Sequence, residues 1–346
     1  MEILGGINDF FGLDIGTTGI RAVQLKKSGA TYTLENYAEL PVQGAFTQSD
    51  SAMDRQKTTQ AIRDLMHQAG ITAKHVAANI PSQKVFTAIV DMDKMPEADL
   101  NKTIRFQADS FIPTPLEQSK IDWAIIGDSP TDPKKVEVLL SSVPNDYVEA
   151  RLAMIEAAGL NVVALEPDSM ALARAVVPQD SNLPQMVLDI GSNSADLVVV
   201  MSGVPHLSRA IPVGANAIVR SVVQNLAVDN NQAQQFVFKF GLDKTKLEGR
   251  VYHAIVDTVD GLMNEVEKSI KFFQGRYQAS KIERIIVTGG ASSIPELPVY
   301  IANRFALNVE VGNAWRNVSI PQARYNELAA VSNHFSIAVG LAERSE

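Results

Sequence analysis

Cysteine is absent from the 346-residue chain, which excludes disulfides, thiolate metal sites and cysteine nucleophiles. Long apolar runs are also absent, and none approaches the ~20 residues that a membrane-spanning helix needs. Basic clusters are missing as well, since no basic run exceeds Lys-Lys and the net charge is −8. Binding to nucleic acid, or directly to an anionic membrane, would need such clusters, so the sequence argues against both.

Several familiar catalytic and targeting patterns are missing too. The five histidines, at positions 67, 75, 206, 253 and 334, have no metal-ligand spacing, and neither G-x-x-x-x-G-K-[ST] nor G-x-S-x-G occurs. The N-terminal stretch "MEILGGINDFF" lacks the charged region of a secretory signal. We therefore expect a cytoplasmic protein whose ligand site is built from other features.

One short pattern occurs twice. The stretch "FFGLDIGTTGIRAVQL" (residues 10–25) is followed 175 residues later by "MVLDIGSNSADLVVV" (residues 186–200), with Leu-Asp-Ile-Gly identical. Each copy reads as a strand ending at an acid, a glycine-led turn and a second strand, and a third strand follows in both halves. Because the length already predicts two or more units, we interpret the chain as a duplicated α/β protein.

The chemistry of the two turns suits a phosphate chain. Gly16 and Gly191 let the backbone approach a ligand closely, and successive N–H groups in such turns can form an anion-binding concavity. Asp14 and Asp189 repel phosphate, but they can hold Mg²⁺ through its waters. The side-chain donors of the turns are Thr17, Thr18, Ser192 and Asn193. We predict that the two turns face each other across a cleft and grip a phosphate chain from both sides.

A third element is "IIVTGGASSIPE" (residues 285–296), in which Gly289 and Gly290 follow a strand and precede a helix. Such a junction allows close approach of the backbone and brings a helix N-terminus nearby. A nucleoside or its phosphates would fit there.

Residues 84–160 have their own β-α-β-β-α pattern and predict a small inserted subdomain. The stretch 177–184, with prolines and polar residues, reads as a linker. The expected division is residues 1–83 and 161–184 for the first lobe, 84–160 for the insert, 185–220 and 282–346 for the second lobe, and 221–281 for a helical subdomain.

Two such turns followed by a Gly-Gly junction resemble the actin-like ATPase superfamily. The resemblance implies an α/β fold with two duplicated RNase H-like lobes that close on ATP and Mg²⁺. In its terms Asp14–Thr18 is the first phosphate loop, Asp189–Ala195 with Asp196 is the second, and Gly289–Ala291 is the adenosine loop. "IPVGANAI" (residues 211–218) is similar to the second connecting segment, which puts Gly214 near the cleft.

The insert resembles those of the FtsA and PilM families. "MPEADLNKTIRFQADSFIPTPLEQSKIDWAI" and "AGLNVVALEPDSMALARAV" are similar to the PilM pattern, and the chain stops at "SIAVGLAERSE" without the membrane-binding tail of FtsA. The resemblance implies a cytoplasmic ATP-binding protein of the type IV pilus inner-membrane platform. Its implied partners are the N-terminal peptide of a PilN-like membrane protein, other platform proteins and motor ATPases, and the peptide groove is expected around Phe106, Phe111 and Ile112.

The sequence departs from its relatives in two places. The second turn reads Gly-Ser-Asn-Ser-Ala where related ATPases tend to have Gly-Gly-Gly-Thr-Thr. In "NQAQQFVFKFG" (residues 231–241), Gln234 and Val237 replace the polar residues expected near the ribose, so only Lys239 remains basic there. No residue stands out as a general base or catalytic group, so we expect ATP binding with weak or no ATPase activity.

Two alternatives stay open at this point. A small-molecule kinase of the same superfamily would need a substrate pocket with a catalytic acid in the cleft. An FtsA-like cell-division filament protein would polymerise on membranes. The insert and the absence of a tail favour the pilus protein over both.

Overall fold

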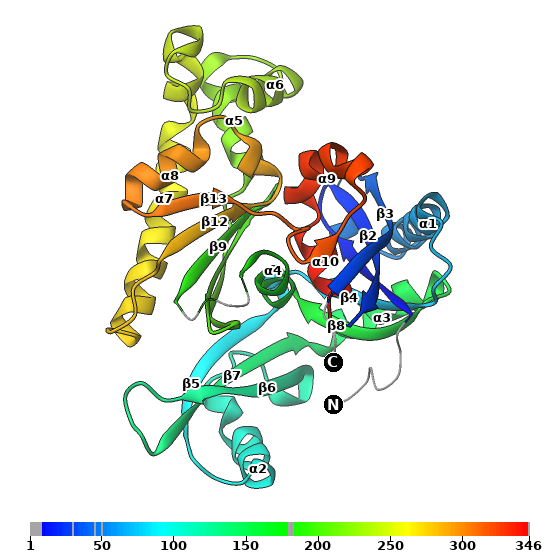
Figure 1. The fold of residues 1–346 in the computed structure, drawn as a ribbon, viewed down its shortest axis with the longest axis vertical. Coiled ribbons are helices and arrows are strands. Elements are labelled where there is room, and N and C mark those ends of the chain that lie inside the picture. Colours follow the sequence, from blue (N-terminus) through cyan, green and yellow to red (C-terminus); the bar gives the residue numbers. More distant parts are fainter. Residues whose placement is uncertain are drawn as a thin grey trace.

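The computed structural model describes residues 9–29, 31–44, 46–49, 51–178, 181 and 183–344, which form two lobes with one smaller unit attached to each (Figure 1). The expected linker at 177–184 lies partly outside these residues. Among the described residues, no helix has both the length and the apolar character needed to cross a membrane.

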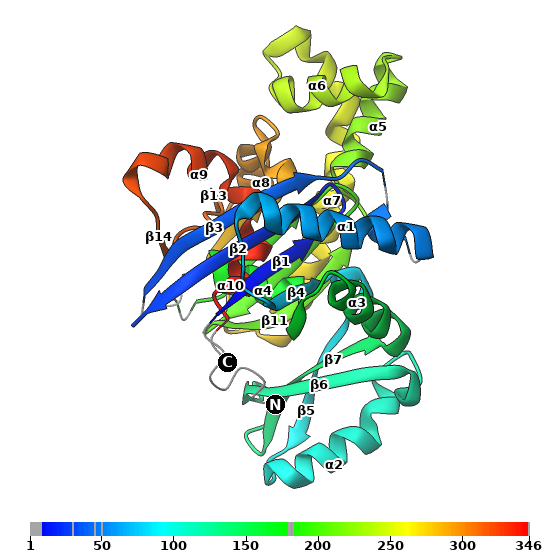
Figure 2. The same cartoon turned by 90° about the vertical axis from the view of Figure 1, so that its right-hand side faces the viewer.

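The first lobe is built on a six-stranded sheet with the order β14-β3-β2-β1-β4-β8. Its first three strands form the predicted antiparallel meander, and β4 and β8 continue parallel to β1. The strands are β1 (Phe10–Ile15), β2 (Gly19–Ser28), β3 (Thr31–Pro41), β4 (His75–Ile80), β8 (Asn161–Pro167) and β14 (Val318–Ser319). Helix α1 (Ala52–Ala69) covers one face of this sheet, starting at the cap Ser51 and ending at Gly70 in the left-handed conformation (Figure 2).

The second lobe repeats the same plan in a five-stranded sheet, ordered β11-β10-β9-β12-β13. Three antiparallel strands again come first, and two parallel strands follow on the other side of the first strand. The strands are β9 (Gln185–Ile190), β10 (Ala195–Met201), β11 (Val204–Ile211), β12 (Arg284–Thr288) and β13 (Asn308–Val311). The duplication predicted from the repeated turn is therefore confirmed at the level of whole sheets.

Two further units extend the lobes. The insert has a three-stranded sheet, ordered β5-β7-β6, whose buried side chains form a core with α2. At the end of the molecule opposite the insert lies a helical unit, formed by α6 and the adjoining ends of α5 and α7 (Figure 1). The elements of the insert are β5 (Phe86–Asp93), α2 (Glu97–Gln107), β6 (Ser119–Asp128), β7 (Lys135–Pro144) and α3 (Asn145–Ala157). The helices of the second lobe are α5 (Ala215–Leu226), α6 (Asn230–Phe240), α7 (Arg250–Arg276) and α8 (Leu297–Phe305).

The packing differs from the expected division at two places. Helix α3, expected within the insert, places Met154 and Ile155 in the core of the first lobe. The end of the chain, expected with the second lobe, joins the first: β14 pairs with β3, and α10 (Ser336–Ala342) packs on β1, with α9 (Tyr325–Val331) preceding it. Neither arrangement has a signal in local periodicity, because both depend on contacts between residues far apart in sequence.

Helix α10 and helix α4 (Asp168–Val176) lie between the two sheets, and their buried side chains form one core with residues from both lobes (Figure 1). The approach is very close. A Cβ atom on Gly340 would lie 1.9 Å from the carbonyl oxygen of Ala171, and one on Gly12 would lie 2.2 Å from that of Ala338. Glycine at these positions therefore sets the spacing between the lobes.

Replacing Gly340 by Ala should push α10 away from α4 and lower the free energy of unfolding by about 1–3 kcal/mol, as overpacking of a core does. The matched control is Gly261→Ala on α7, where an added Cβ meets nothing within 4 Å. That change should stabilise the protein by up to about 1 kcal/mol through helix propensity. Guanidinium unfolding measures both, and equal stabilities of the two variants would contradict the packing argument.

Candidate functional site

A cavity of about 410 Å³ lies between the lobes, and both predicted turns line it. The first loop (residues 16–18) follows β1, and the second loop (residues 191–194) follows β9. The same backbone bond closes each turn: Gly16 N donates to Gly19 O at 3.0 Å, and Gly191 N donates to Ser194 O at 2.9 Å. The repeated sequence thus folds into a repeated local structure.

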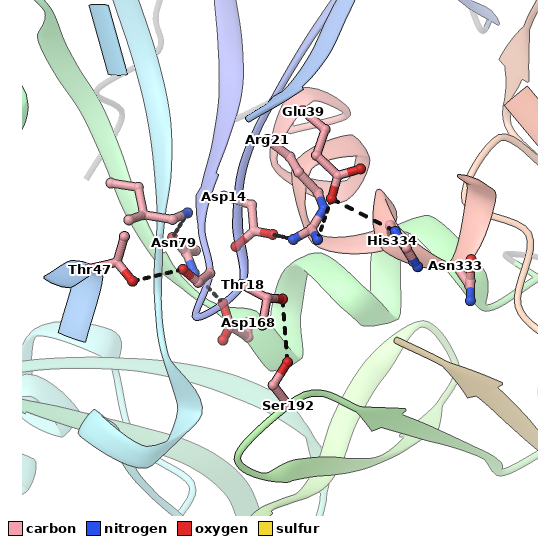
Figure 3. Close-up of polar contacts among 12 residues, drawn as sticks. Asp14, Thr18, Arg21, Glu39, Thr47, Asn79, Asp168, Ser192, Asn333 and His334 are labelled. Atoms are coloured by element: carbon pink, nitrogen blue, oxygen red, sulfur yellow. Dashed lines mark hydrogen bonds and ion pairs between the residues drawn. The ribbon is translucent and has the colours of Figure 1, made fainter. Parts of the chain in front are cut away.

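The two loops face each other and touch (Figure 3). Ser192 Oγ donates to Thr18 Oγ1 at 3.3 Å, across the gap between the lobes. Gln48 makes a second bridge, since its amide donates to Thr17 Oγ1 at 2.7 Å and accepts from Asn193 Nδ2 at 3.1 Å. The structure therefore brings together the loop residues that the sequence singled out, and it adds a strap from residues 46–49 that the sequence did not reveal.

Gly214 supports the second loop from beneath and does not line the cavity. A Cβ atom there would lie 2.6 Å from Gly191 O, and the following amides, Ala215 N and Asn216 N, donate to the carbonyls of Gly191 and Ser192 at 2.9 Å each. The first turn of α5 thus holds the second loop in place.

The Gly-Gly junction also reaches the cavity, through Gly289 and Gly290. Gly289 has φ +81°, and a Cβ atom on it would lie 2.6 Å from Asp189 Oδ1, so glycine is required twice over. Asn333 holds the junction by accepting from Gly289 N at 3.0 Å and donating to Gly289 O at 3.1 Å. Helix α8 does not follow directly, because a 3₁₀ turn (Gly290–Ser293) intervenes and buries Ala291 completely in the core.

Lys239 is not part of this site. It is exposed on α6, with Nζ 5.5 Å from the centre of the Phe240 ring, and it does not line the cavity. Its neighbour Val237 is fully buried in the core of the second lobe. The sequence of residues 231–241 therefore reflects the packing of α6 against the core of the second lobe, and not contacts with a nucleotide.

Four aspartates lie on the cavity wall: Asp14, Asp168, Asp189 and Asp196. Burial, together with the negative charges of Asp196 and Asp14, raises the pKa of Asp189 to about 8. Burial raises the pKa of Asp196 to about 7, and burial and the neighbouring aspartates raise the pKa of Asp168 well above its usual range. Burial likewise raises the pKa of Asp14, although Arg21 opposes it. The site concentrates negative charge that protein groups do not fully compensate.

This donor set fits a hard cation. Asp14 Oδ1 and Asp196 Oδ1 are buried without a hydrogen-bond partner, and carboxylate oxygens are the ligands that Mg²⁺ prefers. Within the part of the chain that the structure describes, no three His, Asp or Glu side chains converge to hold a metal directly. Asp14 and Asp189 could therefore hold Mg²⁺ through its waters and a bound ligand.

A buried amide organises the first loop and one of the aspartates. Asn79, at the end of β4, accepts from Ile15 N at 2.9 Å and donates to Asp168 Oδ1 at 3.0 Å. Arg151 of α3 donates to the same amide oxygen at 2.8 Å. Sequence reasoning missed all three polar side chains. The available signals were weak: a lone Asn at the end of an apolar strand, and an acid directly after Pro167 at a helix start.

Arg21 is also engaged within the protein. It donates to Asp14 Oδ2 at 3.2 Å and pairs with Glu39 at 2.7 Å. His334 Nδ1 lies 3.8 Å from Glu39 Oε1. His334, together with Arg21, lowers the pKa of Glu39 to about 2. Figure 3 shows this chain of charges from the first loop to the residues that hold the Gly-Gly junction.

The raised pKa values predict a pH dependence of stability. Folded Asp189 keeps its proton up to about pH 8, whereas the unfolded carboxyl loses it near its ordinary pKa of 3.8, so stability falls as the pH rises between these values. In the Asp189→Asn variant, the free energy of unfolding should decrease less as the pH rises. At pH 8 this variant should therefore be more stable than the wild type by on the order of 1–3 kcal/mol. Guanidinium unfolding from pH 4 to pH 8.5 measures this, with Asp99→Asn on the exposed face of α2 as control. Parallel curves for Asp189→Asn and the wild type would refute it.

Comparison with known proteins agrees with this architecture. The chain is similar to a protein in a solved PilM-PilN type IV pilus biogenesis complex, with 23% identity, coverage of 96% of this chain and 97% of that one, and a TM-score of 0.82. It is also similar to MreB5 of Spiroplasma citri bound to ADP, with 12% identity, coverage of 96% and 94%, and a TM-score of 0.55. These likenesses show the actin-like ATPase fold that the resemblance implied.

Among curated sequences, the cell division protein FtsA of Bacillus subtilis (strain 168) is 22% identical over an alignment of 259 residues, and the match covers 67% of this chain and 58% of FtsA. The chain therefore spans little more than half the length of that relative. A family model described as type IV pilus assembly protein PilM matches residues 12–346. The chain belongs to the PilM family of type IV pilus assembly proteins.

Proposed function

We propose that this protein binds Mg·ATP between its lobes and works as a cytoplasmic assembly protein of the type IV pilus inner-membrane platform. There it would hold the cytoplasmic N-terminal peptide of a PilN-like membrane protein. The observation that carries the proposal is the meeting of two duplicated glycine-led loops over an acidic cavity. The similarity to a protein of the PilM-PilN complex is consistent with the peptide partner, and the similarity to MreB5 bound to ADP and to AMPPNP is consistent with nucleotide binding.

The residues of the cleft divide the work of nucleotide binding by their chemistry. The backbone N–H groups of the two loops, with the side chains of Thr17, Thr18 and Ser192, would bind the phosphate chain. Asp14 and Asp189 would face Mg²⁺, which supplies the positive charge that lets phosphates and carboxylates share one cavity. Gly289 and Gly290 would lie against the nucleoside because neither carries a Cβ atom.

Weak or absent turnover is the kinetic part of the proposal. Hydrolysis needs a group that orients water in line with the phosphate. The second loop offers Asn193, but its amide oxygen accepts from Asn216 at 2.8 Å and its amide nitrogen donates to Gln48. Of the aspartates, Asp14 is paired with Arg21 and Asp168 accepts from Asn79. Because these contacts engage Asn193, Asp14 and Asp168 within the protein, they favour a role in which bound ATP stabilises one arrangement of the lobes rather than being hydrolysed rapidly.

Two exposed aromatic residues of the insert suit a peptide groove. Phe106, on α2, is 87% exposed, and Phe111, just after α2, is 40% exposed. Large apolar side chains at such exposure favour contact with a partner. Ile112 differs from the expectation, because it is 5% exposed and packs in the core of the insert. We therefore assign the groove to the two phenylalanines.

The cellular setting follows from the partner. The protein would sit at the cytoplasmic face of the inner membrane through its PilN-like partner, with no insertion of its own. Other platform proteins and motor ATPases of the pilus would be further partners. A pull-down with the cytoplasmic tails of neighbouring membrane proteins would identify them.

The nucleotide half is tested by calorimetry with Mg·ATP. Asp189→Ala removes a carboxylate beside the expected cation, so the affinity should fall about 10- to 100-fold. Asp243→Ala, on an exposed turn outside the cavity, should leave the affinity within about twofold. Equal affinities of Asp189→Ala and the wild type would place the nucleotide elsewhere.

The peptide half is tested by fluorescence anisotropy with a synthetic N-terminal peptide of the PilN-like protein. Phe106→Ala should weaken binding about tenfold or more, as loss of a central aromatic anchor does. The matched control is Phe272→Ala on α7, which removes a phenylalanine that is 69% exposed on the second lobe. Similar effects of the two substitutions would rule out a groove at the insert.

A further inference from the structure

The insert contacts both lobes, one on each side of the cleft. On the first-lobe side, α3 anchors it: Thr59 Oγ1 donates to Met154 O at 3.1 Å, and Arg151 donates to Asn79 in the network that holds the first loop. The insert is thereby attached, through α3, to the lobe that carries the first loop.

On the second-lobe side, one buried carboxylate makes the contact. Glu137 of β7 is 2% exposed, and three donors from the second lobe converge on its Oε1 atom. Arg276 donates through Nε at 2.8 Å and through Nη2 at 2.6 Å, and Tyr277 donates its hydroxyl at 2.8 Å. Arg276 Nη2 also reaches Asp91 of β5 at 2.8 Å. We call Glu137, Arg276 and Tyr277 the latch.

The latch resists separation of the insert from the second lobe. Pulling these elements apart would break three hydrogen bonds to one carboxylate at once, two of them from a guanidinium, which is more costly than breaking a single exposed ion pair. His206 of β11 stands on the other side of the same carboxylate, with Nε2 4.0 Å from Oε2. The carboxylate of Glu137 is thus enclosed by second-lobe side chains, although it belongs to the insert.

Binding of a nucleotide would act on the latch by changing the contact between the two loops. The hydroxyls of Thr18 and Ser192 are 3.3 Å apart and bond directly to each other. A phosphate oxygen that accepts from Ser192 Oγ must replace this bond, because a hydroxyl has only one proton to donate. Once bonds to the ligand replace this bond between the lobes, the loops and the lobes that carry them are free to shift relative to each other. The insert is tied to both lobes and must either follow the second lobe or lose the latch.

We propose that the latch couples the two binding events, so that a nucleotide in the cleft changes the affinity of the insert for its peptide. The inference rests on the proposed function and adds its regulation. Coupling between two sites is reciprocal, so the peptide changes nucleotide affinity by the same factor. Glu137 is a positioning residue here, since it lies outside the cleft and away from the two groove phenylalanines.

The first test compares peptide affinity with and without saturating Mg·AMPPNP. The wild type should show a change of about fivefold or more, within the usual range of allosteric coupling. Glu137→Gln keeps the shape of the side chain but removes its charge, and it should bring the ratio to within about twofold of one while both ligands still bind. Arg276→Gln, at the more exposed end of the latch, should do the same if the first variant folds poorly.

The matched control is Glu265→Gln on α7. Glu265 is also paired with cations, Arg209 at 2.7 Å and Lys268 at 2.6 Å, but all three belong to the second lobe. This variant should keep the wild-type ratio. A wild-type ratio of one, or an unchanged ratio in both latch variants, would overturn the proposal.

A second test follows the movement itself and needs no peptide. Because the chain has no cysteine, pairs of introduced cysteines can be labelled uniquely. Lys102→Cys on the insert is paired with Lys271→Cys on the second lobe or with Gln60→Cys on the first, and distances between spin labels are measured with and without Mg·AMPPNP. In the wild-type background the insert should follow the second lobe, so the first distance stays constant and the second changes. In Glu137→Gln the pattern should reverse.

The outcomes separate the two proposals. No binding of Mg·AMPPNP by calorimetry overturns the proposed function and the coupling together. Binding that leaves both distances unchanged, or that gives the same pattern in the wild type and Glu137→Gln, overturns the coupling alone.

Discussion

The close packing of α10 against α4 and β1 is the constraint on which the rest of the structure depends. Two sheets share this thin helical layer, and Gly12 and Gly340 keep it thin. The first strands of the two sheets therefore end on either side of one gap, and their glycine-led loops meet there. Neither lobe alone holds a complete site, so the geometry of the cavity reports how the lobes are held together.

Electrostatics gives the cavity its second property. Burial raises the pKa of all four aspartates, and the charges of neighbouring aspartates raise the pKa of Asp168 and Asp189 further. The site therefore favours binding of positive charge and of groups that bring positive charge with them. Arg21 and Asn79 compensate Asp14 and Asp168 only in part. A phosphate chain accompanied by Mg²⁺ would satisfy the loops and the acids at once, whereas either component alone would satisfy one of them.

The repeat was readable from sequence because its elements are local. A strand, an acid and a glycine-led turn are specified by adjacent residues, and the meanders of both sheets followed from them. Lys239 and Ile112 show where this reasoning failed: a position in a pattern does not say whether a side chain reaches a cavity, the surface or a core. Asp168 and Glu137 acquire their roles only from residues 89 and 139 positions away, which no local pattern encodes.

The return of the chain to its starting lobe has a consequence for how the protein is made. Strand β14 extends the sheet that β1–β3 begin, and Tyr32 donates its hydroxyl to the carbonyl of Glu343, 311 residues later. During translation, one face of the first lobe would stay exposed until the last residues of the chain have been synthesised. The insert can form its own core much earlier, because the residues of that core lie close together in the sequence. The lobe whose strands are synthesised first is thus completed last, and such long-range closure slows folding and prolongs exposure of apolar surface.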